Sequence, residues 1–334
     1  MKNIGFFTLI ILAALILVPV STVRNPRATS AMDASPDISH SVSEAGVSAS
    51  SEENVIKVWR TSSSRAEDIP EKEYIKGCVA AEMSAGCELE ALKAQAAASY
   101  TYAIYHKLNQ SEDPSPDLEG AYLTDSTKKH QGYLSEEERK KLWGDSFEKY
   151  EQKITAAVEA VCGKVITYDG APIMAAFHSV SAGQTESAEN VWGKDIPYLK
   201  SVSSPGDKLS PECESTLTFT LKEFKEQLSD IEGLKLGDDP EKWVGKTQKT
   251  KAGTVTGITI GNRALTGSEL RSALELKSCC FDIKYEKNKF IVHTMGHGHL
   301  VGMSQYGADY MARQGSSWEE IIQHYYTGIR ISDL

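Results

Sequence analysis

Three short segments of the sequence carry side chains that could do acid–base or sugar-binding chemistry. In the first, V-A-A-E-M, the carboxyl group of Glu82 stands among apolar residues. An apolar environment disfavours the ionised form, so we expect the pKa of Glu82 to be raised toward the range where a carboxyl group donates a proton near neutral pH. The alternative is that Glu82 reaches solvent at the edge of an apolar stripe, or pairs with Lys76 or Lys93.

The second segment, residues 177–186, reads F-H-S-V-S-A-G-Q-T-E and is followed by V-W-G. Its hydroxyls, amide, carboxylate and indole resemble a sugar subsite, where polar groups bond hydroxyls and an aromatic face stacks on the ring. The alternative is a well-capped turn. We do not expect Ser179 to be a nucleophile served by His178, because adjacent residues of a strand point to opposite faces and no G-x-S-x-G motif is present.

The third segment, residues 293–308, combines histidines with glycines. In a strand, His297 and His299 would share a face, with His293 aligned further back, and such a set could hold zinc. No H-E-x-x-H motif is present. The glycines favour instead a backbone held close to a ligand or to another element.

Two predicted helices form a hairpin that carries Glu82. The first covers 71–83, begins after Pro70 and has apolar residues spaced by three and four on one face. The second covers 88–107, where strong helix formers include a run of alanines that lets another element approach closely. Residues 84–87 join the two helices.

The rest of the chain predicts an α+β fold, in which a helical front half packs with a mainly antiparallel β back half. A strand signal begins at Val55, a capping box opens a helix at Ser135, and Asp169-Gly170 favours a hairpin turn. Short helices are expected at 223–229 and 268–274. Further strands are expected at 164–168, 172–178, 217–221, 254–260, 281–285 and 290–293.

Composition is that of an ordinary globular chain. Of 334 residues, 40% are hydrophobic and 25% charged, and 36 basic against 46 acidic residues give a net charge of −10. This length leaves room for one large or two modest domains, and we expect one folded domain at 55–334. Because the chain is acidic and has no dense basic run, we expect no nucleic-acid partner.

The N-terminal region reads as a membrane attachment. Residues 4–20 are uncharged and apolar, near the shortest length that spans a bilayer as a helix. We predict a membrane anchor at 1–20 rather than a cleaved signal, because no small-x-small cleavage site follows directly. The Ser/Ala-rich segment 21–54 is predicted to be a disordered tether.

The six cysteines follow none of the short-spaced zinc frameworks. Two alternatives remain: a disulfide between Cys78 and Cys87, or buried free thiols. We favour the free thiols.

Taken together, these motifs resemble the sporulation stage II protein D family of bacterial cell-wall lytic transglycosylases, which also includes amidase enhancers. The resemblance runs from about Val55 to Ile331. Its motifs appear in order as P-E-K-E-Y-I-K-G-C-V-A-A-E-M, A-L-K-A-Q-A, T-D-S-T, F-H-S-V-S-A-G-Q-T-E with V-W-G, L-R-S-A-L and G-H-G-H-L-V-G-M-S-Q-Y-G-A. Six motifs in register are highly specific.

The resemblance implies a membrane-anchored enzyme outside the cytoplasmic membrane that cleaves MurNAc–GlcNAc linkages of peptidoglycan, preferring strands stripped of stem peptides. It implies a role in engulfment during endospore formation, with a partner amidase and a multipass membrane protein, and we expect no cofactor. The family's catalytic Glu falls on Glu82. The expected substrate-binding residues are Lys93, Tyr100, His178, Ser179, Ser181, Gln184, Glu186, Trp192, His299, Ser304, Gln305 and Tyr306.

The chain departs from the family pattern at four positions. Tyr100 stands where an Arg is usual, and a phenol cannot replace a charged, forked donor. A zinc-bearing subgroup has cysteines on both sides of D-S-T, where this chain has Leu123 and Lys129, so we predict no metal there. The other departures are Ser84 for Pro, Ala182 for Gly and Leu300 for Gly.

Two other functions remain open. One is a glycan-holding activator of an amidase that has no turnover of its own, which the substitution at Tyr100 favours. The other is a zinc amidase that uses His293, His297 and His299, which predicts metal on purification and inhibition by a chelator.

Overall fold

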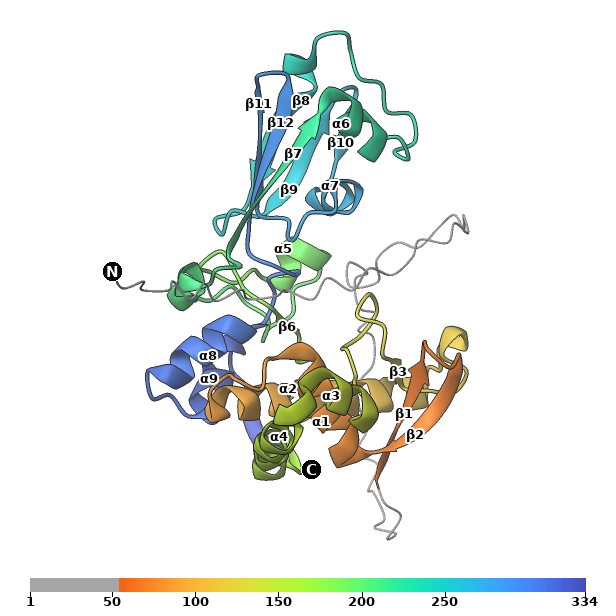
Figure 1. The fold of residues 1–334 in the computed structure, drawn as a ribbon, viewed down its shortest axis with the longest axis vertical. Coiled ribbons are helices and arrows are strands. Elements are labelled where there is room, and N and C mark those ends of the chain that lie inside the picture. The colour runs from red at the N-terminus through yellow and green to blue at the C-terminus, as the bar shows by residue number, and fades with distance from the viewer. Residues whose placement is uncertain (1–53) are drawn as a thin grey trace, which may run out of the picture.

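The computed structural model describes residues 54–334, and its buried hydrophobic side chains form two separate cores. The larger core belongs to residues 54–213 and 296–334, which we call the helical lobe. The smaller core belongs to residues 214–295, the sheet lobe. Figure 1 shows the sheet lobe above the helical lobe, with α5 (Ala188–Trp192) between them. The sheet lobe is therefore an insertion in the chain that builds the helical lobe.

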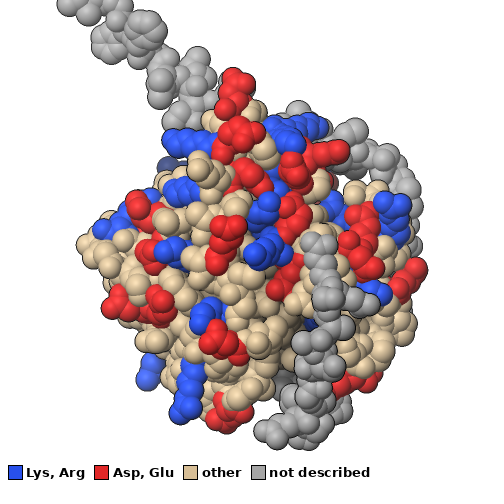
Figure 2. Space-filling view, turned by 90° about the horizontal axis from the view of Figure 1, so that it is seen from below, with Lys and Arg blue, Asp and Glu red and all other residues tan. Residues whose placement is uncertain are grey.

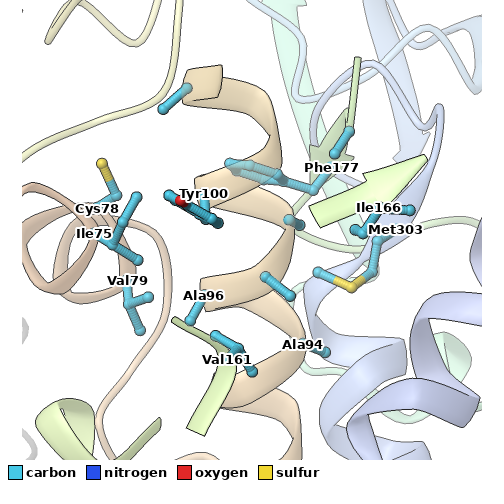
Figure 3. Packing of buried hydrophobic residues seen from close by; sticks show 14 of the residues in the cluster. Ile75, Cys78, Val79, Ala94, Ala96, Tyr100, Val161, Ile166, Phe177 and Met303 are labelled. Atoms are coloured by element: carbon cyan, nitrogen blue, oxygen red, sulfur yellow. The ribbon is translucent and has the colours of Figure 1, made fainter. Parts of the chain in front are cut away.

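The helix hairpin predicted to carry Glu82 is confirmed. Helix α1 (Glu71–Glu82) begins after Pro70, and α2 (Leu89–Glu112) runs five residues beyond the predicted end. Alanines of α2 let neighbours pack close to its backbone, as Figure 3 shows for α1 on one side and Phe177 on the other. Helix α2 is thus the central element of the larger core.

Other helices surround α2, and the predicted capping box of α3 (Glu136–Trp143) at Ser135 is confirmed. Helix α4 (Phe147–Val161) packs on α1 and α2. Two C-terminal helices, which follow the sheet lobe in the chain, also pack on α2. The sequence analysis did not predict α4 or these C-terminal helices. They are α8 (Gln305–Arg313) and α9 (Trp318–Tyr325).

Short strands border the helical lobe. The predicted hairpin at Asp169-Gly170 forms, but its second strand was predicted too long at 172–178. That stretch splits into β5 (Ala171–Pro172), antiparallel to β4 (Lys164–Tyr168), and β6 (Phe177–His178), which pairs in parallel with β13 (Met303–Ser304). The remaining strands are β1 (Val55–Arg60), β2 (Arg65–Pro70), β3 (Leu123–Thr124) and β14 (Arg330–Asp333).

The sheet lobe contains two antiparallel three-stranded sheets, ordered β11-β12-β7 and β10-β9-β8. Stacked aromatic rings of Phe224, Phe290 and Trp243 fill its core, with centroids 4.0 Å apart for the first pair and 5.6 Å for the last two. The helices of the helical lobe and the antiparallel sheets of the sheet lobe confirm the predicted α+β class. The elements are β7 (Glu214–Thr220), α6 (Leu221–Gln227), β8 (Val244–Lys249), β9 (Val255–Ile260), β10 (Arg263–Leu265), α7 (Gly267–Leu274), β11 (Phe281–Glu286) and β12 (Lys289–Met295).

Charge is mixed on the face seen in Figure 2, where basic and acidic side chains alternate over the helical lobe without a continuous basic band on its described part. Within residues 54–334, no helix has the length and apolar character needed to cross a bilayer. The predicted anchor at 1–20 and tether at 21–54 lie outside the described residues, apart from Asn54. All six cysteines lie inside them and are free thiols.

Candidate active site around Glu82

Glu82 is the last residue of α1, and its carboxyl group meets the loop that follows β3. Its Oε1 accepts a hydrogen bond of 2.6 Å from the backbone N–H of Gly132. A Cβ atom at position 132 would lie 3.2 Å from Oε1 and 3.1 Å from Cβ of Ala81. A glycine at this position therefore lets the loop backbone approach the carboxyl group closely.

A row of amide side chains continues from the other carboxyl oxygen. Gln305, the first residue of α8, places Nε2 3.4 Å from Oε2 of Glu82 and 3.4 Å from Oε1 of Gln95. Gln95 in turn donates to Oγ of Ser99 at 3.1 Å. Glu82 is thus held between a backbone donor and a buried polar row that joins α1, α2 and α8.

The predicted direction of the Glu82 pKa is confirmed. Burial raises the pKa of this carboxyl group, and the hydrogen bonds from Gly132 and Gln305 oppose the increase. Within residues 54–334, no second ionised carboxyl group contributes to this pKa. The alternative ion pairs are wrong, because both lysines bind other carboxylates. Nζ of Lys76 lies 2.7 Å from a carboxylate oxygen of Glu73 and 2.8 Å from one of Glu151. Nζ of Lys93 lies 2.6 Å from a carboxylate oxygen of Glu90.

A group of aromatic rings, missed in the sequence analysis, extends from Tyr102 on α2. The Tyr102 ring lies 4.3 Å from that of His106, which lies 4.7 Å from that of His130. Burial is the main cause that raises the pKa of the Tyr102 phenol, and the nearby Tyr105 and Glu82 raise it further. Burial lowers the pKa of His130 to about 4, so this imidazole is neutral at physiological pH.

Asp207, whose side chain is fully buried, holds the polar turn 177–186 in place by hydrogen bonds. Its Oδ2 accepts hydrogen bonds from the backbone N–H, at 2.9 Å, and from the hydroxyl of Ser181. Its Oδ1 accepts the hydroxyl of Ser304 at 2.8 Å, and Ser304 caps α8 by accepting the N–H of Gly307 at 3.2 Å. Asp207 therefore fixes the start of α8, where Gln305 projects toward Glu82.

Two rings of the predicted sugar subsite, His178 and Trp192, lie close to the ring of His299 from the third segment. His299 lies 5.9 Å from His178 and 5.3 Å from Trp192, measured between ring centroids. Burial lowers the pKa of His178 to about 3 and that of His299 to about 4, so both are neutral. Nδ1 of His178 donates to the carbonyl of Val301 at 3.1 Å, and its buried Nε2 has no hydrogen-bond partner among residues 54–334.

The side chains of two predicted substrate-binding residues, Tyr100 and Lys93, have partners other than Glu82. Tyr100 is 4% exposed, packs in the core beside α1 (Figure 3), and its hydroxyl interacts with Glu71 at the opposite end of that helix. Lys93 is tied to Glu90, which accepts the backbone N–H of Trp318 at 2.9 Å. Because positions 93 and 95 differ by about 200° around a helix, Lys93 points away from the amide row.

The other predicted residues belong to the polar turn and its surroundings. Ser179 and Tyr306 are half-buried and joined by a backbone hydrogen bond of 3.0 Å. Gln184 is exposed and donates to Ser201 at 2.9 Å. Glu186 is buried and accepts hydrogen bonds from Asn190 at 2.8 Å and from Thr250 of the sheet lobe at 2.6 Å. Glu186 thereby links the two lobes.

The strand that would align three histidines does not form. Strand β12 ends at Met295, and the chain turns at Gly296 and Gly298, whose φ angles are 77° and 105°. His293 instead bonds Thr216 on β7. Among residues 54–334, no group of three or more His, Cys, Asp or Glu side chains is arranged to hold a metal ion.

Three residues of this site lacked a signal strong enough to single them out in the sequence. Gly132 follows the T-D-S-T motif, and Gln95 lies inside A-L-K-A-Q-A, but neither type carries chemistry by itself. Asp207 stands in a segment outside every motif. Their roles depend on contacts between distant segments.

Comparisons with known proteins agree with this arrangement of motifs. The family model described as Stage II sporulation protein matches residues 60–168. Stage II sporulation protein D of Bacillus subtilis is 43% identical over 279 residues, which cover 83% of this chain and 79% of that protein. The protein of the same name from Bacillus amyloliquefaciens is 42% identical, with 83% and 78% covered.

A more distant relative carries a different name. The amidase enhancer of Bacillus subtilis is 28% identical over 311 residues, which cover 77% of this chain and 40% of that protein. The identity to the two Bacillus sporulation proteins extends over more than three quarters of each. On that basis, the chain belongs to the stage II sporulation protein D family.

Proposed function

We propose that this protein is a peptidoglycan lytic transglycosylase that cleaves MurNAc–GlcNAc linkages and leaves anhydro-MurNAc ends. The observation that carries the proposal is the Glu82 carboxyl group, whose pKa is raised by burial although the residue as a whole is only half-buried. Membership of a sporulation family supports a role in septal wall remodelling and engulfment during endospore formation.

Glu82 serves as acid and then as base. Its neutral carboxyl group donates a proton from Oε2 to the glycosidic oxygen, because Oε1 is occupied by the short hydrogen bond from Gly132. The bond between C1 of MurNAc and this oxygen breaks, which frees the 4-hydroxyl of GlcNAc. The C6 hydroxyl oxygen of the same MurNAc then bonds C1, and its proton returns to the Glu82 carboxylate. No water is consumed.

A single carboxyl group is sufficient for this sequence of steps. Hydrolysis with retention or inversion ordinarily uses two carboxyl groups, one of them to attack C1 or to activate water. Among residues 54–334, the hydrogen-bond partners of the Glu82 carboxyl group are Gly132 and Gln305, and neither is an acid. The internal C6 hydroxyl replaces the missing nucleophile, which favours transglycosylation over hydrolysis.

The proposal includes a location and partners. A domain that cleaves peptidoglycan works outside the cytoplasmic membrane, and the anchor at 1–20 would hold it there through the tether. We propose glycan strands stripped of stem peptides as the substrate, so a partner amidase would act first, together with a multipass membrane protein of the engulfment machinery.

The second candidate is a glycan-holding activator of that amidase without turnover of its own. It is favoured by the similarity to a protein named amidase enhancer. Purified protein separates the two candidates. Stimulation of an amidase without any cleavage of strands would favour the activator, whereas new strand ends in the absence of an amidase favour the enzyme.

The experiment that tests the enzyme compares wild type, Glu82→Gln and Glu71→Gln on stripped strands, with anhydro-MurNAc ends measured by mass spectrometry. Glu71 is the matched control, because burial also raises the pKa of this carboxyl group at the other end of α1. We expect Glu82→Gln to form no anhydro ends and Glu71→Gln to form them. Equal product from wild type and Glu82→Gln would falsify the catalytic role of Glu82.

A further inference from the structure

Residues 124–132, which lead from β3 toward α3, form one side of the candidate active site. We call this segment the acid loop. Its last residue, Gly132, donates the backbone hydrogen bond of 2.6 Å to Oε1 of Glu82. A Cβ atom at position 132 would lie 3.2 Å from that oxygen and 3.3 Å from the methyl carbon of Thr127, so an exposed side chain of the acid loop also lies beside the carboxyl group. The contacts that hold the acid loop therefore bear on the position of Glu82.

A single imidazole closes the acid loop on itself. Nδ1 of His130 accepts the backbone N–H of Thr124 at 3.1 Å, and the backbone N–H of His130 donates to the carbonyl of Ser126 at 2.9 Å. Asp125 binds the acid loop to β1, where Nε of Arg60 lies 3.1 Å from its carboxylate. The acid loop is thus closed by a side chain near its end and attached to the helical lobe at its start.

The hydrogen bond to Thr124 requires a neutral imidazole. A ring nitrogen that accepts an N–H carries no proton, so the proton of His130 resides on Nε2, and an imidazolium could not accept this bond. Burial, together with the charge of Lys129, lowers the pKa of His130 to about 4. The ring faces two uncharged rings, His106 at 4.7 Å and Tyr102 at 6.3 Å between centroids. His130 is therefore an acceptor throughout the neutral pH range.

Only one residue separates His130 from Gly132. That residue, Gln131, is buried, and its Nε2 donates to the hydroxyl of Tyr74 and to the carbonyl of Ser99, both at 3.1 Å. The side chain of Gln131 anchors the acid loop to α1 and α2, whereas His130 closes the backbone that precedes it. The N–H of Gly132 belongs to the planar peptide group that joins it to Gln131, so its direction follows the backbone on that side.

We propose that His130 is a positioning residue of the reaction, which closes the acid loop through its bond to Thr124 and thereby holds the Gly132 N–H on Oε1 of Glu82. This inference rests on the proposed function. His130 acts through Gly132 and contributes no proton itself. The Gly132 donor stabilises the carboxylate and opposes the effect of burial on the pKa of Glu82. The same donor occupies Oε1 and leaves Oε2 to deliver the proton.

Three variants at position 130 separate the role of the acceptor from that of the ring. In His130→Asn, the amide oxygen lies as many bonds from Cα as Nδ1 does and can accept from Thr124. In His130→Gln it lies one bond further out, at the place of Nε2, and His130→Leu has no acceptor. We expect His130→Asn to cleave stripped strands within about threefold of the wild-type rate. His130→Gln and His130→Leu should lower kcat about tenfold and change KM less than about twofold, because the acid is misplaced while binding is kept.

The pH profile of cleavage distinguishes positioning from a loss of stability. Without the Gly132 donor the pKa of Glu82 rises further, so the alkaline limb of kcat should move to higher pH in His130→Gln and His130→Leu but not in His130→Asn. Unfolding of part of the sample lowers the rate without moving the limb. The control is His293→Leu, which removes an exposed imidazole that bonds Thr216 in the sheet lobe and should leave the rate and the profile unchanged.

A measurement without turnover tests the same contact directly. Heteronuclear NMR of protein labelled at the glycine nitrogens reports the Gly132 amide, which is assigned by its loss in Gly132→Ala. In wild type and His130→Asn this resonance should shift as Glu82 ionises, and in Glu82→Gln it should not. His130→Gln and His130→Leu should lose the shift, because the N–H no longer points at Oε1. His130→Gln keeps the comparison valid if His130→Leu does not fold.

Each contrary outcome has a distinct meaning. If His130→Gln and His130→Leu keep the wild-type alkaline limb and the Gly132 shift, Gln131 alone aims the N–H and the inference is wrong. If His130→Asn fails in the same way as His130→Leu, an acceptor at Nδ1 is not what positions Glu82, and the inference is equally wrong. If wild type forms no anhydro ends while the Gly132 shift follows the expected pattern, the proposed function fails and the hold of His130 on the carboxyl group stands.

Discussion

The side chains of Glu82 and Gln305 meet although 223 residues separate them in the chain, with Nε2 of Gln305 3.4 Å from Oε2 of Glu82. One lies at the end of α1 and the other at the start of α8, and the whole sheet lobe is inserted between them. The acid therefore depends on the return of the chain to the helical lobe.

Replacement of Gln305 by Leu should raise the pKa of Glu82 further, because the amide donor that stabilises its carboxylate is lost. We expect the alkaline limb of the pH–rate profile for strand cleavage to move to higher pH, with about a tenfold lower rate from the loss of orientation. The control is Gln184→Leu, since this exposed amide bonds Ser201 and not Glu82. An unchanged alkaline limb in Gln305→Leu would show that the two side chains are not coupled.

The raised pKa of Glu82 also predicts a pH-dependent stability difference between wild type and Glu82→Gln. The Glu82 carboxyl group of wild type is neutral below the pKa of an unfolded glutamate, about 4.3. Above the raised pKa of the folded state, the folded protein must bury an ionised carboxylate. Stability is therefore lost in wild type as pH rises between these values, by about 1.4 kcal/mol per unit of pKa elevation. Glu82→Gln should become the more stable protein over that window, as measured by urea unfolding at a series of pH values.

Glu151→Gln provides a control of opposite sign. Burial opposes ionisation of Glu151, but hydrogen bonds and ion pairs with Arg139 and Lys76 lower its pKa overall. Its carboxylate stabilises the folded state above the unfolded pKa, so Glu151→Gln should become less stable than wild type as pH rises. If both variants change in the same direction, ionisation of Glu82 is not the cause.

Local pattern was sufficient to predict the elements that carry the site. Periodicity and Pro70 predicted α1, and apolar neighbours predicted the direction of the Glu82 pKa. Strand segments at 217–221, 254–260, 281–285 and 290–293 were predicted in the sheet lobe and form there, whereas β8 and β10 were not predicted. These features depend on neighbours within one helical turn or one strand, which a single sequence displays directly.

Contacts between distant segments could not be predicted in the same way. The Gly132 N–H that binds Glu82 and the carboxylate of Asp207 take their roles from loops with no periodic pattern. Tyr100 was assigned to substrate because of its place in a motif, yet α2 turns it into the core. Leu300, at a position where Gly is usual, adopts a φ of 67°, which explains the usual residue only once the backbone is known.

Substitution of Gly132 by Ala should impair cleavage more than folding. The backbone at this position does not require glycine, but a Cβ atom would press within 3.2 Å of Oε1 of Glu82 and displace it by a few tenths of an ångström. We expect at least about a tenfold loss of strand cleavage. Gly237→Ala, where a Cβ atom meets nothing within 4 Å, is the matched control and should keep full activity.

Both variants are measured for anhydro-MurNAc ends and for melting temperature. Loss of cleavage in Gly132→Ala with a melting temperature close to that of Gly237→Ala supports the geometric effect. Equal cleavage by the two variants would mean that the hydrogen bond from Gly132 does not hold Glu82 in its productive position.

Asp207→Asn should both destabilise the protein and disturb Glu82 at a distance. The two carboxyl oxygens of Asp207 accept from Ser181 and Ser304, so an amide nitrogen in place of either oxygen would face a donor. An unsatisfied buried donor costs about 1–3 kcal/mol, which urea unfolding at pH 7 would detect. Because Ser304 caps α8, the start of this helix should shift and carry Gln305 away from Glu82.

The shift of α8 gives Asp207→Asn a second readout that simple destabilisation does not produce. Loss of the Gln305 donor moves the alkaline limb of strand cleavage to higher pH, in the same direction as in Gln305→Leu. Asp195→Asn, an exposed carboxyl group paired with Lys200, should change the unfolding free energy by less than about 0.5 kcal/mol and leave the pH profile unchanged. A destabilised Asp207→Asn with the wild-type pH profile would show that Asp207 supports the fold without positioning the acid.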